Sequence, residues 1–84
     1  MIERYEYGAF NANKEKIMKA NGIEEDIPEW EWLWNAPIEI RLYEEDMKLL
    51  VDKINMEREE EGLLETHGPV IYKRRKVYYD VWED

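Results

Sequence analysis

The chain has 84 residues, 21 of them acidic and 12 basic, a formal net charge of -9 and no cysteine. This length accommodates one domain, residues 1–84, and leaves little room for a deep substrate cavity. The lack of cysteine excludes disulfides, thiolate metal ligands and cysteine nucleophiles. Four Trp and six Tyr predict a folded chain rather than a disordered acidic tail. Because no apolar window approaches the length of a membrane span and the start lacks a signal-peptide pattern, we expect a soluble, cytoplasmic protein with no membrane partner.

The acidic charge is concentrated in the middle of the chain. Residues 24–61 hold fourteen acidic and four basic side chains, a balance of -10, whereas the segments before and after balance to +1 and 0. Such a field attracts basic surfaces and repels nucleic acid and anionic membranes. The distribution therefore indicates a basic protein as the partner, with no direct contact to nucleic acid.

A strand and a short helix are the first elements predicted along the chain. Residues 2–7 are rich in Tyr and Ile, which favours a strand. Asn11 or Asn13 supplies the N-cap of a helix over Lys14–Ala20, whose apolar residues follow helical spacing. We place Gly22 as the left-handed residue that closes this helix, in preference to a hairpin turn.

Two structures compete for the tryptophan-rich segment that follows. A capping box over residues 26–29 precedes apolar residues at helical spacing, and such a helix leaves Trp32 facing away from Trp30 and Trp34. In a strand the three tryptophans share one face instead. Periodicity does not separate the two structures over so few residues, and we favour the short helix.

The clearest strand and the clearest helix follow Pro37. Ile38–Tyr43 alternates apolar and polar residues, as does a strand with its apolar face buried and the other face in water. From Glu44 to Glu61 the period becomes that of an amphipathic helix, which Gly62 ends. Its predicted buried stripe is Met47, Leu50, Val51, Ile54 and Arg58.

A hairpin is predicted at the end of the chain. Val70–Tyr72 and Val77–Trp82 are enriched in β-branched and aromatic residues, and the basic run Lys73–Lys76 between them is typical of a turn. The order of elements then predicts an α+β fold: a small, mainly antiparallel sheet of three to four strands, with one long and one or two short helices packed on it.

Signals for catalysis and metal binding are weak. Thr66 and His67 are the candidate pair of nucleophile and base, but neighbouring residues on an extended segment point to opposite faces. The acidic triplets lack the alternating ligands and central glycine of a calcium loop, and the dispersed glycines form no phosphate-binding loop. We therefore expect a non-enzymatic protein with no metal and no cofactor.

The most informative acidic cluster lies at the end of the long helix and consists of Glu57, Glu59, Glu60 and Glu61. A helix C-terminus disfavours anions, so the cluster either serves a partner or is a solvated last turn in a Glu-rich chain. The triplets Glu24–Asp26 and Glu44–Asp46 are instead predicted at helix starts, where the helix dipole favours them.

Three apolar side chains are candidates for contact with a partner. Trp32 is an aromatic anchor if its segment is helical, and its alternative is ordinary core packing. Leu49 and Met56 lie opposite the buried stripe of the long helix, where they offer a contact to a partner or to a second copy in a homodimer.

Together these features predict an antagonist that occupies the basic, nucleic-acid-binding surface of a target protein, with carboxylates standing in for backbone phosphates. Phage-encoded inhibitors of host defence or transcription fit this description. One alternative is an antitoxin or immunity protein that neutralises a basic nuclease. Another is a nucleic-acid-binding module, in which Lys73–Lys76 and the tyrosines beside it hold single strands, although we favour neutralisation of nearby carboxylates for that run. The expected partner-binding residues are Glu29, Glu31, Trp32, Glu44, Glu45, Asp46, Glu57, Glu59, Glu60 and Glu61.

Overall fold

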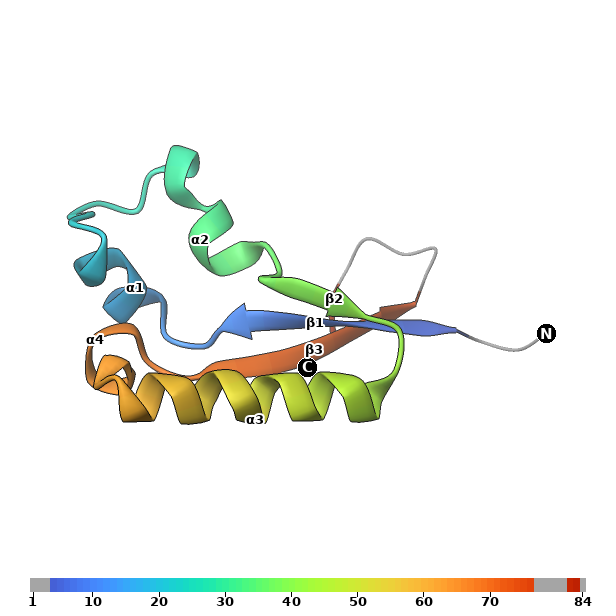
Figure 1. Ribbon diagram of the computed structural model, residues 1–84. Coiled ribbons are helices and arrows are strands. Elements are labelled where there is room, and N and C mark those ends of the chain that lie inside the picture. Colours follow the sequence, from blue (N-terminus) through green and yellow to red (C-terminus); the bar gives the residue numbers. More distant parts are fainter. Residues whose placement is uncertain (1–3, 77–81, 84) are drawn as a thin grey trace.

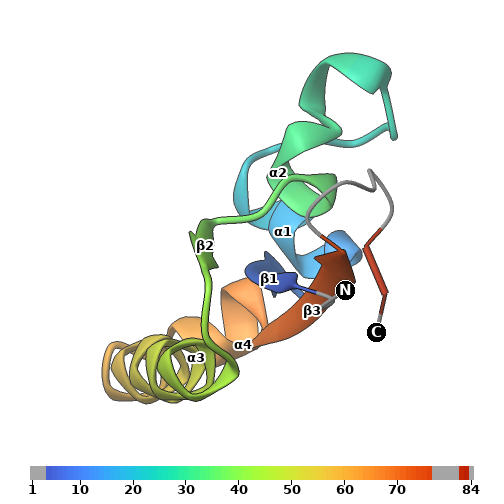
Figure 2. The same cartoon turned by 90° about the vertical axis from the view of Figure 1, so that its right-hand side faces the viewer.

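A three-stranded antiparallel sheet forms the centre of the fold, and helices cover both of its faces (Figure 1). The computed structural model describes residues 4–76 and 82–83. The strand order is β2-β1-β3. The long helix α3 (Glu44–Glu60) runs along one face, and the short helix α2 (Trp32–Asn35) lies on the other side of the sheet (Figure 2). The predicted α+β fold, with one long helix on a small antiparallel sheet, is confirmed.

The central strand is β1 (Tyr5–Asn11), which starts within the predicted strand and extends four residues beyond it. On one side β3 (Val70–Lys76) pairs with β1 along its whole length. On the other side β2 (Glu39–Arg41) pairs with β1 over only three residues. Residues 2 and 3 of the predicted strand lie outside the described residues.

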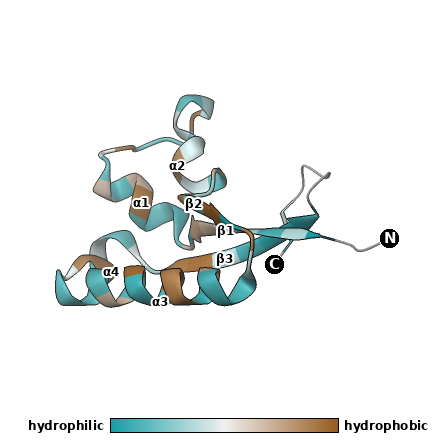
Figure 3. Ribbon diagram, turned by 45° about the vertical axis from the view of Figure 1, so that its right-hand side comes forward, coloured by the Kyte–Doolittle hydropathy of each residue, from teal (hydrophilic) through white to brown (hydrophobic). Residues whose placement is uncertain are grey.

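The core lies between α3 and the sheet. Met47 and Val51 of α3 pack on Ala9 of β1 and Val70 of β3, and the other apolar members of the predicted stripe are half-buried against them. Figure 3 shows hydrophobic segments of α3 and of the start of β3 side by side. The amphipathic helix predicted from the sequence is therefore confirmed, and its polar side is turned to solvent.

Two polar side chains fasten the second half of α3 to the sheet. Asn55 bonds both main-chain groups of Val70: its Oδ1 accepts from the N–H (2.7 Å), and its Nδ2 donates to the carbonyl (2.9 Å). Arg58 donates to the Gly68 carbonyl (2.9 Å) and to Asn11 Oδ1 (2.8 Å). Partial burial lowers the pKa of the Arg58 guanidinium, which nevertheless stays charged at neutral pH. Arg58 thus lies on the inner side of α3, as the stripe predicts.

The first helix, α1 (Lys14–Ala20), has the predicted bounds. Asn13 is its N-cap, because the Asn13 Oδ1 accepts a hydrogen bond from the Lys16 N–H (3.0 Å). Gly22 follows with a φ of 71°, in the left-handed region that glycine adopts without strain. Both the cap and the closing glycine of this helix are confirmed.

The capping box predicted over residues 26–29 does not form. The next helical turn, η1 (Pro28–Trp30), begins after Ile27, which makes no side-chain capping bond. Asp26 pairs with Lys14 of α1 instead. The Asp26 carboxylate is therefore used in an ion pair with a neighbouring helix and does not cap the first amides of η1.

The tryptophan-rich segment is helical, and the alternative of a strand is wrong. After η1 the chain continues directly into α2 (Trp32–Asn35). Trp34 is buried against β1, whereas Trp32 is 59% exposed, as helical spacing predicts.

The turn predicted at Lys73–Lys76 is wrong, because these residues continue β3 (Val70–Lys76). Alternate side chains of a strand point to opposite faces, so the four charged residues are divided between the two faces of the sheet. The partners described for Lys73, Arg74 and Arg75 are aromatic rings or carboxylates. Glu83 pairs with Arg74 in an antiparallel bridge, so a segment after β3 does run back along it. Of the predicted strand Val77–Trp82, all but Trp82 lies outside the described residues.

A short helix that the sequence analysis did not predict, α4 (Leu63–His67), follows the long one. Gly62 ends α3 with a φ of 72°, as predicted. The following residues then form one more helical turn rather than the extended segment assumed above for Thr66 and His67.

The apolar row of β2 is not buried, contrary to prediction. Ile40 is 40% exposed, and Ile38 and Leu42 on either side of the strand are 48% and 66% exposed. Glu39 pairs with Ala9, so it is the polar side of β2 that shares the face covered by α3. The alternation of apolar and polar residues is therefore confirmed, but the prediction that its apolar side is the buried one is wrong.

The face of the sheet away from α3 is closed at its centre by aromatic packing. Phe10 meets Trp82 edge-to-face with 5.3 Å between ring centroids. A Cβ on Gly8 would lie 3.0 Å from atoms of both rings and 3.1 Å from Pro37. A larger residue at this position would therefore press against the two rings and Pro37.

Candidate interaction surfaces

The outer face of α3 is an acidic stripe with two apolar side chains in its middle. Helical spacing puts these residues opposite Met47 and Val51, which are buried in the core. All are exposed, and Leu49 and Met56 are 69% and 60% exposed. This surface, called the α3 outer face below, consists of Glu45, Leu49, Asp52, Met56, Glu59 and Glu60.

The carboxylates of the α3 outer face have no ion-pair partner among residues 4–76 and 82–83. The described ion pairs involve other acids: Lys14 with Asp26, Arg41 with Glu39, Lys48 with Glu44, Arg74 with Glu83 and Arg75 with Glu6. Four carboxylates therefore face solvent along this helix with their charge uncompensated by a contact.

The acidic cluster at the C-terminus of α3 has no stabilising role in the helix. Glu57, Glu59 and Glu60 occupy the last turn, and Glu61 is the C-cap residue. Arg58, the basic residue of that turn, points inward to Gly68 and Asn11. The negative end of the helix dipole is therefore surrounded by like charges, which costs some tenths of a kcal/mol for each.

The predicted partner-binding residues fall into three groups rather than one surface. Glu44, Glu45 and Asp46 form the first turn of α3, about 20 Å from the cluster at its other end, given 1.5 Å of rise per residue. The segment of Glu29, Glu31 and Trp32 lies on the opposite side of the sheet from α3 (Figure 2). The α3 outer face includes Glu45, Glu59 and Glu60 of the predicted set.

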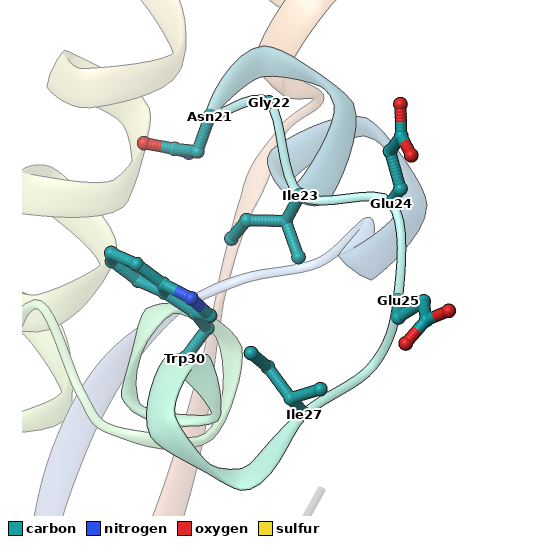
Figure 4. Close-up of a pocket in the computed structure, with 7 residues that line it drawn as sticks. All are labelled: Asn21, Gly22, Ile23, Glu24, Glu25, Ile27 and Trp30. Atoms are coloured by element: carbon teal, nitrogen blue, oxygen red, sulfur yellow. The ribbon is translucent and has the colours of Figure 1, made fainter.

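A hollow of about 390 Å³ between α1 and η1 was missed by the sequence analysis (Figure 4). The side chains of Ile23, Ile27 and Trp30 turn toward one another across it, and Glu24 and Glu25 project outward from the loop that forms its rim. The sequence pattern that could have indicated this hollow is the presence of apolar residues on both sides of the acidic triplet Glu24–Asp26. It was not interpreted in this way because the triplet was predicted at a helix start.

The structure removes the helix-start explanation for Glu24 and Glu25. Both lie in a loop, three or more residues before the single turn of η1, and neither makes an ion pair with a described residue. The triplet Glu44–Asp46, by contrast, does open α3, as predicted, and Glu44 pairs with Lys48.

The basic residues of β3 are engaged within the fold. Arg75 lies over the Trp82 ring (4.2 Å to the centroid) and pairs with Glu6. Arg74 lies over the Tyr5 ring (4.7 Å) with Glu83 at 3.8 Å, and Lys73 lies over Phe10 (5.4 Å). These cations hold the sheet and its aromatic side chains together and are not presented on a loop.

Thr66 and His67 are closer than the sequence analysis assumed, because their segment is helical. Thr66 Oγ1 lies 2.7 Å from His67 Nδ1 and donates to the Leu63 carbonyl (3.3 Å). The hydroxyl thus has two acceptors within reach, the Leu63 carbonyl and Nδ1, and the direction of its bond to Nδ1 depends on which imidazole nitrogen carries the proton. Action as a nucleophile needs the tautomer in which Nδ1 accepts the hydroxyl proton.

Neither a metal-ligand cluster nor a membrane-spanning helix occurs among the described residues. No three histidine, aspartate or glutamate side chains gather closely enough there to hold a metal ion. None of the helices in that part of the chain has the length and apolar composition needed to cross a membrane.

Comparison with known proteins gives no relative from which a function could be transferred. No family model matches the chain, and neither the curated proteins nor the solved structures contain a significant match.

Proposed function

We propose that this protein is a non-enzymatic antagonist that uses the α3 outer face to cover a basic, nucleic-acid-binding surface of a target protein. The observation that carries the proposal is the composition of this face: four exposed carboxylates without ion-pair partners among the described residues, flanking the exposed side chains of Leu49 and Met56.

The chemistry of the face suits a basic protein surface. Carboxylates along one side of a helix attract lysines and arginines that otherwise hold phosphates, and they raise the rate of encounter. Leu49 and Met56 add apolar area that becomes buried at the centre of the contact, where interfaces are less charged than at their rim. Methionine is flexible enough to adapt to an uneven partner surface.

The cluster at the C-terminus of α3 supports the same proposal. Local helix energetics favour Lys or Arg at these positions, so a role in contact with a partner gives Glu59 and Glu60 of this cluster a reason that helix stability does not. An immunity protein for a basic nuclease would use the same face. A nucleic-acid-binding module built on β3 is less favoured, because Lys73, Arg74 and Arg75 contact aromatic rings within the fold.

The test is affinity capture of the target by the tagged protein, followed by measurement of the dissociation constant for the purified pair. We expect a basic nucleic-acid-binding protein whose affinity falls as the salt concentration rises. D52N/E59Q should weaken binding roughly tenfold, if each of the two lost ion pairs contributes about 0.7 kcal/mol.

The matched control is E29Q/E31Q, which removes two charges on the opposite side of the sheet and should leave the affinity almost unchanged. L49A/M56A should also weaken binding without destabilising the fold, because both side chains are exposed. A target that is acidic, or a complex insensitive to salt, would contradict the proposal.

A further inference from the structure

We propose that the hollow between α1 and η1 binds an arginine side chain from an extended basic segment of a protein partner. The hollow lies on the side of the sheet opposite α3 (Figures 1 and 2), so this is a second contact that goes beyond the proposed function.

The lining of the hollow matches the two parts of an arginine side chain. Ile23 and Ile27 offer aliphatic surface for its methylene stem, and the Trp30 indole offers a face on which a planar guanidinium stacks (Figure 4). Trp30 is 40% exposed, so part of its side chain is open to solvent. Arginine fits better than lysine because its guanidinium is planar and less strongly hydrated than an ammonium.

The loop that borders the hollow carries negative charge. Glu24 and Glu25 project outward from this loop, away from Ile23, Ile27 and Trp30, and neither has an ion-pair partner among the described residues. An adjoining hollow of about 370 Å³ shares Gly22, Ile23 and Glu24, and its lining adds Glu15 and Lys19, whose charges offset each other. The negative charge that attracts basic residues on either side of the bound arginine therefore comes from Glu24 and Glu25.

Several aromatic rings of this fold have a lysine or arginine side chain above them. Trp34 has Lys14 at 5.2 Å from its ring centroid, and Trp82 has Arg75 at 4.2 Å. Among the residues that the structure describes, no cation lies over Trp30. Trp32 also lacks one, but it does not line the hollow, so among the four tryptophans, all of which lie in the described part of the chain, Trp30 is the one that combines a ring without a cation and a place in the lining of the hollow.

The experiment is an NMR titration of the full chain with the peptide acetyl-Arg-Arg-Arg-amide. We expect the largest shifts at the Trp30 indole N–H and at the methyl groups of Ile23 and Ile27. The same peptide with citrulline, which keeps the shape of arginine without its charge, should bind roughly tenfold more weakly, and the lysine peptide should fall between the two.

Two variants with a matched control complete the test. E24Q/E25Q should weaken binding of the arginine peptide roughly threefold to tenfold, whereas D46N/E65Q, which makes the same change in net charge at two exposed residues outside the hollow and the α3 outer face, should alter it by less than about twofold. Trp30→Leu keeps an apolar side chain but removes the aromatic face, so the peptide should no longer shift the methyl signals of Ile23 and Ile27. Both altered glutamates are exposed, so E24Q/E25Q remains informative even if Trp30→Leu loosens the loop.

Three results would overturn the inference. They are equal binding of the citrulline peptide, shifts centred on α3 instead of Trp30, and equal weakening by E24Q/E25Q and D46N/E65Q. None of them affects the proposed function of the α3 outer face, which is tested on the captured target.

Discussion

Asn55 is the side chain whose removal tests the account of the fold most sharply. Its amide satisfies both the N–H and the carbonyl of Val70, a residue only 1% exposed. Asn55→Ala leaves both groups without a protein partner, at about 1–3 kcal/mol for each group that water does not reach. We expect a loss of about 2–4 kcal/mol, from a total of roughly 4–13 kcal/mol for a chain of this size. The midpoint of thermal unfolding should fall by roughly 10–30 °C.

The assay is urea unfolding followed by circular dichroism, with Asn35→Ala as the control. Asn35 ends α2 and is exposed, so its substitution should change the free energy of unfolding by less than about 0.5 kcal/mol. Hydrogen exchange adds a local readout, because the Val70 amide should lose its protection in Asn55→Ala. A change below about 0.5 kcal/mol in Asn55→Ala would refute the reasoning, since water would then replace the Asn55 amide at no cost.

Two further predictions concern stability. Gly8→Ala should destabilise the fold by about 1–3 kcal/mol, because its Cβ would meet Phe10 and Trp82 at 3.0 Å, and an unchanged unfolding midpoint in urea would show that the rings yield freely. Glu60→Lys and Glu61→Lys should each stabilise the fold by about 0.3–1 kcal/mol, because a cation replaces an anion at the C-terminus of α3. Thermal unfolding at low and high salt checks the second prediction: the gain should shrink with salt, and a loss of stability would contradict the helix-dipole argument.

The elements predicted correctly are those in which local signals and packing agree. In α1 the Asn13 cap and Gly22 mark both ends, and in α3 the stripe from Met47 to Arg58 matches the side that packs on the sheet. The Lys73–Lys76 run misled because its composition is typical of a turn, while its actual partners, Phe10, Tyr5 and Trp82, come from other segments of the sequence. No local pattern reveals such partners.

The exposed row of β2 was assigned wrongly for a related reason. Alternation identifies which residues share a face, but the covered face depends on where α3 packs. The register opposite Ala9 turns Glu39, not Ile40, toward that helix. Tertiary pairing, rather than periodicity, decides this choice.

The two candidate sites also differ in how far the sequence alone predicts them. The α3 outer face follows from the helical period alone, so Leu49 and Met56 were recognised in advance. The hollow depends on Ile23, Ile27 and Trp30 converging from a loop and a single helical turn, which periodicity does not predict. Because Glu24 and Glu25 were predicted at a helix start, their charge was explained by the helix dipole. The structure shows that neither residue begins a helix.

The central claim is that the α3 outer face takes the place of nucleic acid on its target. The most direct test is a competition measurement, in which the purified target bound to a labelled oligonucleotide is titrated with this protein. The account predicts mutually exclusive binding, with the oligonucleotide released in proportion to the complex formed, and release by D52N/E59Q only at roughly tenfold higher concentration. A stable ternary complex of target, oligonucleotide and this protein would contradict it.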